Sequence, residues 1–213
     1  SKPLAVVLCC LRSRPMWHFS LCWMFWSFGF SGFVFWLPLL LQEQLGGGSS
    51  AALISLLSCI PYAIACVGLL AFSFTTTRFH RDRLFASITN GLGAVAYAVI
   101  AIVTAVIPSP SIVAVLALFS LVAAGIWGVF GPFWSMPARI LPPWALSTGY
   151  AMINSVGTLG AALSPVCMGA MKDNLGSFAG AIGVLSACMT VAVACVATAG
   201  AQVEHTGTYR VKA

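Results

Sequence analysis

The chain has 213 residues, of which 60% are hydrophobic and 7% are charged. An ordinary soluble domain carries about 25% charged residues, so this composition excludes that class. The formal net charge is +6, but the basic residues lie in short segments between apolar stretches rather than on a basic stripe interleaved with aromatic residues, so no nucleic acid partner is expected.

Six hydrophobic stretches follow one another, and each is long enough to cross a hydrocarbon core, which needs roughly 20 apolar residues. They cover residues 17–41, 50–74, 84–107, 111–134, 146–171 and 177–199. The first follows a basic segment, but it is too long for a signal peptide and no small-residue cleavage site follows it. The chain begins with Ser, as a fragment or a processed product would. We predict an all-α membrane protein with six transmembrane helices at residues 17–199, an N-terminal segment at 1–16 and a tail at 200–213.

The basic residues are distributed unevenly about these six spans. When the chain is threaded back and forth, nine of the ten fall on one side: Lys2, Arg12, Arg14, Arg78, Arg81, Arg83, Arg139, Arg210 and Lys212. Lys172 alone falls on the other side. Because basic loops stay cytoplasmic, we expect the segment 1–16 and the tail 200–213 to be cytoplasmic. Membrane lipid is an expected partner, since anionic headgroups attract such loops.

The connections between spans are short, so we expect consecutive helices to be near neighbours. The segment 135–145 contains Pro137, Pro142 and Pro143 and is expected to be a bent, non-helical connector. Glycines recur in the fourth and fifth spans, where small residues let helices approach closely. Four further prolines lie within or near the ends of spans: Pro38, Pro61, Pro132 and Pro165. Such prolines favour a bundle that bends around a cavity.

The residue pattern does not indicate an enzyme. No Asp, Glu, Lys or Arg lies inside a span, and metalloprotease, hydrolase and phosphate-loop motifs are absent. The eight cysteines and three histidines have no metal-ligand spacing. We therefore predict that the protein is not an enzyme and needs no cofactor. His18, at the start of the first span, is interpreted as an ordinary interfacial residue.

The polar residues inside the spans are few. Asn90 and Asn154 are the only core amides, and Asn154 lies on a helical stripe with Tyr150 and Thr158. Two interpretations of Asn154 remain open: a wet cavity wall, or an interhelical hydrogen bond worth about 0.6–2 kcal/mol. For Asn90 the interhelical bond is favoured. Tryptophans line the first and fourth spans: Trp23, Trp26, Trp36, Trp127 and Trp134.

Five motifs occur in a familiar order. They are Phe35-Trp36-Leu37-Pro38, Ile60-Pro61-Tyr62, Gly131-Pro132-Phe133-Trp134-Ser135-Met136-Pro137, Ile153-Asn154-Ser155-Val156-Gly157-Thr158-Leu159-Gly160 and Gly176-Ser177-Phe178-Ala179-Gly180. With them, the chain resembles the C-terminal half of a Major Facilitator Superfamily transporter, in particular of the anion:cation symporter family. The likeness covers about residues 15–200, and its strength comes from five motifs in order.

The resemblance implies one six-helix half of a twelve-helix bundle, with substrate held between the halves near the membrane midplane. It implies secondary transport of a small organic anion, typically a carboxylate, with a proton or sodium ion as coupling ion. The missing N-terminal half would be a partner and would carry the coupling acids and the substrate-binding Arg. That division agrees with the absence of charge inside the spans here.

The expected substrate-facing residues have two sources. The resemblance places Asn154 at the cavity, and Tyr62 and the aromatic first span on the central path. The remaining candidates come from the polar stripe and the tryptophans. The full set is Asn154, Thr158, Tyr62, Tyr150, Trp36 and Trp127.

Two features depart from the family pattern. Thr158 stands where the family has a second Asn, and a hydroxyl offers fewer hydrogen bonds than an amide. Residues 74–83 keep basic residues but lack the Gly and leading Asp of the family's gating signature, so charge-pair gating is not expected there. The alternative function is a non-transporting six-span subunit with a regulatory or assembly role. A channel is disfavoured because no charged ring or selectivity-filter motif occurs.

Overall fold

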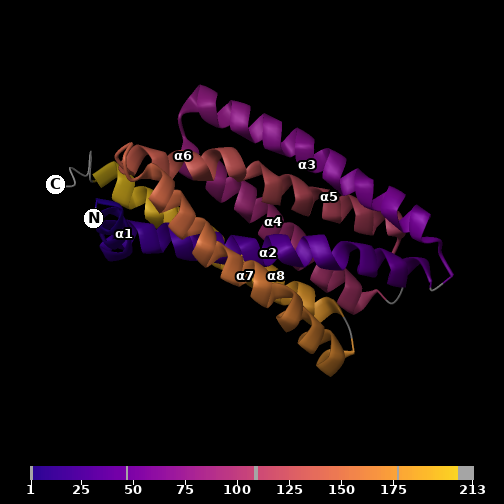
Figure 1. Cartoon of the computed structure of the whole chain (residues 1–213). Helices are drawn as coiled ribbons and strands as arrows, with labels where there is room; N and C mark the ends of the chain where they lie inside the picture. The colour runs from indigo at the N-terminus through magenta and orange to yellow at the C-terminus, as the bar shows by residue number, and fades with distance from the viewer. Residues whose placement is uncertain (1, 47, 108–109, 177, 206–213) are drawn as a thin grey trace.

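The computed structural model describes residues 2–46, 48–107, 110–176 and 178–205. Over these residues the chain forms helices and no strand: α1 (Lys2–Arg12), α2 (Arg14–Leu45), α3 (Ala51–Phe79), α4 (Asp82–Val106), α5 (Ile112–Gly128), α6 (Phe130–Ile140), α7 (Leu146–Leu175) and α8 (Phe178–His205). Six segments are long and apolar enough to cross a membrane, with α5 and α6 together forming the fourth. The predicted all-α fold with six membrane-spanning helices is confirmed (Figure 1).

The fourth span is interrupted at Val129, between α5 and α6. Pro132 has no amide hydrogen, so it cannot donate to the Gly128 carbonyl one turn earlier. The helical pattern restarts when the Phe133 N–H donates to the Val129 carbonyl at 2.8 Å. The proline therefore divides one membrane span into two helices.

The expected connector at residues 135–145 is wrong in its first half, because α6 continues through Pro137 to Ile140. A helix that passes a proline gives up one backbone hydrogen bond, and α6 continues to its C-cap, where the Leu141 N–H donates to the Pro137 carbonyl at 3.0 Å. The helix ends because Leu141 precedes Pro142, and a residue before proline is driven toward extended backbone. Its φ of −82° and ψ of 135° are of that kind.

The most extensive helix contacts join helices that are mostly not consecutive. They pair α2 with α7, α4 with α8 and α3 with α5, while α4 with α5 and α2 with α8 connect the pairs. The expectation that consecutive helices pack together holds for α4 and α5, but α2 with α3 and α3 with α4 share few contacts. A short loop fixes only the helix ends, and the fit of side chains along the helices decides the rest.

Burial differs between the helices of the bundle. Half of the most apolar stretch is buried in α2 and likewise in the span formed by α5 and α6, against 22% in α3 and 28% in α7. These two spans are therefore central, and α3 and α7 each present a broad apolar face outward. In a membrane such a face is covered by lipid or by another group of helices.

Glycines mark the closest approaches between helices, as the sequence predicts. A Cβ on Gly160 of α7 would overlap the Met24 carbonyl oxygen of α2. A Cβ on Gly125 of α5 would lie 2.6 Å from the Thr89 carbonyl oxygen and 2.7 Å from the Gly93 nitrogen of α4. These backbones meet without an intervening side chain, which is how helices associate in lipid.

Charged side chains lie at the two ends of the bundle. Asp82, at the start of α4, has a side chain only 6% exposed and forms a 2.7 Å ion pair with Arg139 near the end of α6. At the opposite end, Lys172 lies 3.7 Å from Glu43 and 3.7 Å from the ring centroid of Phe178. The Asp82 pair is a charge contact made from residues 74–83, the segment in which the sequence does not favour charge-pair gating.

Replacing Gly160 by Ala is expected to destabilise the protein by about 1–3 kcal/mol, because the new methyl group must displace the backbone of α2. Gly169→Ala on the same helix is the matched control, since a Cβ there meets nothing within 4 Å. Thermal unfolding of both variants in detergent, followed by size-exclusion chromatography, gives the comparison. Equal melting temperatures would contradict the close contact of α2 with α7.

Candidate functional site

Asn154 lies on α7, is exposed, and is attached to α2 by one hydrogen bond. Its Oδ1 accepts from the Nε1 of the buried Trp23 at 3.2 Å. Among the described residues its Nδ2 has no hydrogen-bond partner, so two N–H donors are available. Both interpretations of this residue thus have a structural counterpart, because the oxygen makes an interhelical bond while the amide nitrogen faces outward.

The residues of the polar stripe on α7 do not all face the same way. Thr158 is exposed, and its hydroxyl donates to the Asn154 carbonyl of its own helix at 2.9 Å. The Tyr150 hydroxyl donates to the Trp134 carbonyl at 3.0 Å. Gly157, by contrast, is buried against the Trp23 ring. The stripe therefore offers an exposed amide and an exposed threonine beside a face that packs on α2.

Seven aromatic rings form a continuous series of contacts beside Asn154. In order they are Tyr150, Trp134, Trp23, Trp26, Phe30, Trp127 and Tyr62. Successive ring centroids lie 4.1–5.5 Å apart, and the tightest pair is the stack of Trp23 on Trp26. We call these residues the aromatic series; they connect α7, α6, α2, α5 and α3, which belong to four of the six spans.

Most of the aromatic series is not fully covered. Trp23 and Trp26 are buried, whereas the other five rings are half-buried. A partly bare ring can stack on a planar group, and aromatic pairs of this kind are worth about 0.5–1.5 kcal/mol beyond area burial. The surface next to Asn154 therefore combines partly exposed aromatic rings with the N–H donors of the Asn154 amide.

The site is electrically neutral within its own helices. No Asp, Glu, Lys or Arg occurs in residues 15–42, 84–138 or 140–171, which carry every residue of the site except Tyr62. Residues 44–77, around Tyr62, also lack them. Within the described part of the chain no cluster of three His, Cys, Asp or Glu side chains could hold a metal ion. A charged solute at this surface would need its counter-charge from outside these six spans.

The structure brings together four of the six expected site residues. Tyr150, Trp127 and Tyr62 belong to the aromatic series, and Asn154 bonds to its member Trp23. Trp36 lies apart, in contact with Phe178 of α8 at 5.3 Å between ring centroids. Its Nε1 is buried and, within the described residues, has no partner. Thr158 is on the exposed side of α7 and outside the ring contacts.

Sequence reasoning underestimated three rings of α2. Trp23, Trp26 and Phe30 recur at i, i+3 and i+7, the spacing of one helix face, and that signal was available. They form the middle of the aromatic series, and Trp23 donates the hydrogen bond to Asn154. Their role depends on α6 and α7 lying beside α2, which helical spacing alone does not reveal.

Two other expectations are corrected here. Asn90 was expected to bond across helices, but its Nδ2 donates to the Ala86 carbonyl of the same helix at 3.0 Å. Its Oδ1 is buried and has no partner among the described residues. His18, interpreted from the sequence as an ordinary interfacial residue, has its Nε2 2.8 Å from the Cys195 carbonyl oxygen and 3.1 Å from the Thr198 hydroxyl, so it connects α2 with α8.

Comparison with known proteins identifies the family. The sequence profile described as Major Facilitator Superfamily matches residues 1–165. The chain belongs to the Major Facilitator Superfamily. Its membrane spans are therefore those of a transporter family, and its six helices match one half of that family's bundle.

Individual relatives in this superfamily are transporters by name. A quinolone resistance transporter of Acinetobacter baumannii is 34% identical over 74% of this chain and 35% of its own length. The putative metabolite transport protein NicT of Pseudomonas putida is 29% identical over 73% of the chain and 34% of its own length. A putative tartrate transporter of Agrobacterium vitis is 29% identical over the same shares. The chain thus spans about a third of the length of the curated relatives it matches.

A double-mutant cycle with Trp23→Phe and Asn154→Ala tests the bond between α2 and α7. We expect a coupling energy of about 0.6–1.7 kcal/mol in thermal or denaturant unfolding, the range found for hydrogen bonds between membrane helices. Trp127→Phe in place of Trp23→Phe is the control, because the Trp127 indole makes no hydrogen bond among the described residues. Equal coupling in both cycles would show that Asn154 does not depend on the Trp23 N–H.

Proposed function

We propose that this chain is the C-terminal half of a secondary transporter of the anion:cation symporter type. It moves a small organic anion, a carboxylate, with a proton or sodium ion as coupling ion. The observation that carries the proposal is the exposed Asn154 amide, oriented by Trp23 and set beside the aromatic series. The name of one relative, a putative tartrate transporter, favours the same class of solute.

The surface provides some of the contacts that a bound anion requires. The two N–H donors of Asn154 can bond a carboxylate or hydroxyl oxygen, and the half-buried rings can cover its carbon skeleton. Burying an anion without an opposite charge is costly, and these six spans supply none in their interior. We therefore assign two kinds of residue to an N-terminal six-helix half. One is the cationic residue that neutralises the substrate, and the other is the set of acidic residues that couple substrate movement to the ion.

The outward faces of α3 and α7 support this division of roles between two six-helix halves. Both helices bury less than a third of their most apolar stretch within the chain. A second half packed on part of these faces would enclose the aromatic series in a cavity at the interface between halves. Rocking of one half against the other would then expose the cavity to each side in turn.

Asn154→Ala in the full-length protein is expected to weaken the apparent affinity for the transported anion about 10-fold, the loss of a hydrogen bond to a charged group. Asn174→Ala is the matched control: it removes an exposed amide from the same helix, whose Nδ2 bonds to the Ala170 carbonyl and to no other described residue. Concentration dependence of uptake, with surface expression measured on the same cells, separates binding from folding. Unchanged affinity in Asn154→Ala would remove this residue from the site.

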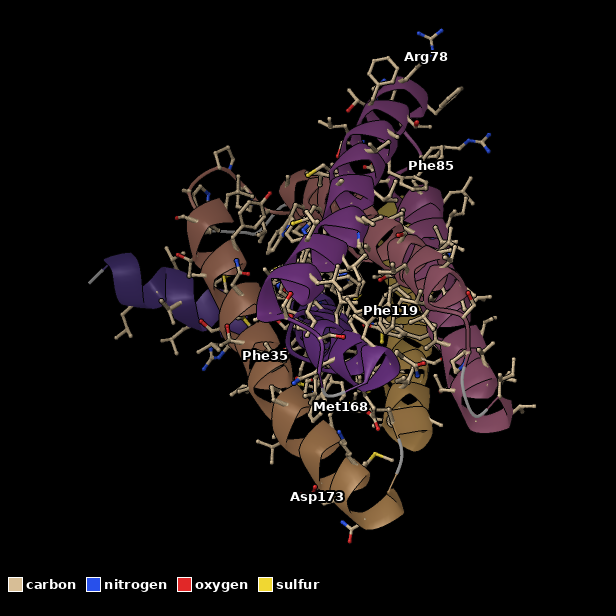
Figure 2. The ribbon with its side chains drawn as sticks, turned by 90° about the vertical axis from the view of Figure 1, so that its right-hand side faces the viewer. Phe35, Arg78, Phe85, Phe119, Met168 and Asp173 are labelled. Carbon is tan, nitrogen blue, oxygen red and sulfur yellow. The ribbon has the colours of Figure 1, made fainter. Side chains whose placement is uncertain are left out.

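The membrane orientation is proposed from the basic residues, with the Arg78–Arg83 segment cytoplasmic. Figure 2 places Arg78 and Asp173 at opposite ends of the molecule. Thr77→Cys and Gly48→Cys, in a cysteine-free background, should react with an impermeant maleimide from opposite sides of the membrane, Thr77→Cys from the cytoplasm. Both positions are exposed, and a Cβ on Gly48 meets no atom within 4 Å. Reaction of both from one side would contradict the proposed orientation.

A further inference from the structure

The helix α1 makes few contacts with the six spans, and one of its faces is apolar and left uncovered by the described residues. Leu4, Val7, Leu8 and Leu11 are 59%, 40%, 44% and 44% exposed, at the i, i+3, i+4 and i+7 spacing of one helix face. Figure 2 shows α1, in indigo, projecting sideways from the bundle. A short helix with one apolar face in this orientation fits a place along the membrane surface rather than through it.

The join between α1 and α2 is a fixed elbow. Ser13 has extended backbone, with φ −81° and ψ 114°, as the position before Arg14-Pro15 at the start of a new helix requires. Its N–H donates to the Cys10 carbonyl at 3.1 Å. The Trp17 indole N–H donates to the Leu11 carbonyl at 2.8 Å. These bonds satisfy the end of α1 and hold it at a set angle to α2.

A hollow of about 770 Å³ lies at this elbow. Its lining combines apolar side chains of α1 with two guanidinium groups: Ala5, Leu8, Cys9, Arg12, Ser13, Arg14 and Pro15. Arg12 and Arg14 are both exposed, and within the described residues neither forms an ion pair. Two unpaired guanidiniums beside an apolar wall fit a ligand with a phosphate at one end and hydrocarbon at the other.

The surroundings of the hollow indicate that this ligand belongs to the membrane. The exposed stripe of α1 continues onto α2 at Trp17 and Leu21, each 43% exposed. Leu21 lies further along the first membrane-spanning helix, so the stripe continues onto a part of the protein that is expected to face lipid. Trp17 stands where a tryptophan favours the boundary between headgroups and acyl chains. A soluble partner would have no reason to meet an apolar surface that continues into the bilayer.

We propose that the elbow between α1 and α2 is a binding site for an anionic phospholipid, with Arg12 and Arg14 on its phosphate and Leu8 and Leu11 along its acyl chains. The site is separate from the proposed substrate surface, which lies between α2, α3, α5, α6 and α7. It makes α1 a surface anchor that fixes how deeply the start of the first span sits in the membrane.

Cys9 provides a direct readout of occupancy because it lines the hollow. Its neighbour Cys10 is buried, and burial, helped by the nearby Cys9 thiol, raises the pKa of Cys10 above its ordinary value. Cys10 therefore stays a protonated and shielded thiol at neutral pH, and maleimide modification of this segment reports on Cys9.

The test uses the full-length protein that contains this chain, purified in detergent and titrated with short-chain phosphatidylglycerol. We expect phosphatidylglycerol to protect Cys9 from maleimide and phosphatidylcholine to protect it far less. The double variant Arg12→Gln/Arg14→Gln should need about 10- to 30-fold more phosphatidylglycerol, given the usual contribution of each basic residue near an anionic surface. Leu8→Ser should also weaken protection.

The matched control is Arg78→Gln/Arg81→Gln, which removes the same charge from another exposed segment. It should leave protection unchanged, and an equal loss in this variant would overturn a localised site. Glycerol phosphate, which lacks acyl chains, should not protect Cys9; protection equal to that by phosphatidylglycerol would mean a simple phosphate site. Equal protection by phosphatidylcholine would also overturn the proposal.

Melting temperatures without lipid should match for all variants, because the replaced side chains are exposed. The Leu8→Ser variant tests the site independently of the arginines.

Discussion

Close approach of helix backbones is the constraint on which this bundle depends. Inside a membrane, apolar side chains gain little by leaving lipid for protein, so helices associate where their surfaces fit most closely. Gly160 lets α7 meet the backbone of α2 at Met24, and Gly125 lets α5 meet α4 at Thr89 and Gly93. These contacts place α2 at the centre and determine which of its side chains face α6 and α7. The aromatic series follows from that placement.

The aromatic series and Asn154 act together as one structural unit. Trp23 stacks on Trp26 and on Phe133, while its indole N–H donates to Asn154. Rings packed in this way have few rotamers open to them, so the amide oxygen is held and the amide nitrogen keeps one direction. In the proposed transporter such an arrangement lets Asn154 meet a solute without a large ordering cost, which is how preorganised sites gain affinity.

The charged side chains at the two ends of the molecule make different contacts. At the end that carries Arg78 and Arg139, the Asp82 carboxylate is buried and paired, and α1 turns sideways through a fixed elbow. At the other end Lys172 lies between Glu43 and the Phe178 ring. Both contacts tie the ends of different spans together where the chain meets water. The middle of the bundle stays neutral, which agrees with the assignment of coupling charges to another half.

The sequence alone determined the fold class, the number of spans and the family resemblance. Hydrophobic length is a local property, and a membrane admits few structures for such stretches other than helices. The distribution of basic residues likewise gave a definite orientation to test. Asn154, Tyr62, Tyr150 and Trp127 could be named as candidates because motif and helical spacing are read along one chain.

Only the tertiary structure decided which side chains meet. Pro137 lies inside α6 because a helix can lose one backbone hydrogen bond and continue, whereas Pro142 ends it by constraining Leu141. Asn90 bonds to its own helix, and Asp82 forms an ion pair with Arg139 of α6. The rotation and crossing angles of the helices determine which side chains become partners. Trp36 faces α8 rather than the aromatic series for the same reason. Spacing along a helix tells which residues share a face, but packing between helices determines what that face contacts.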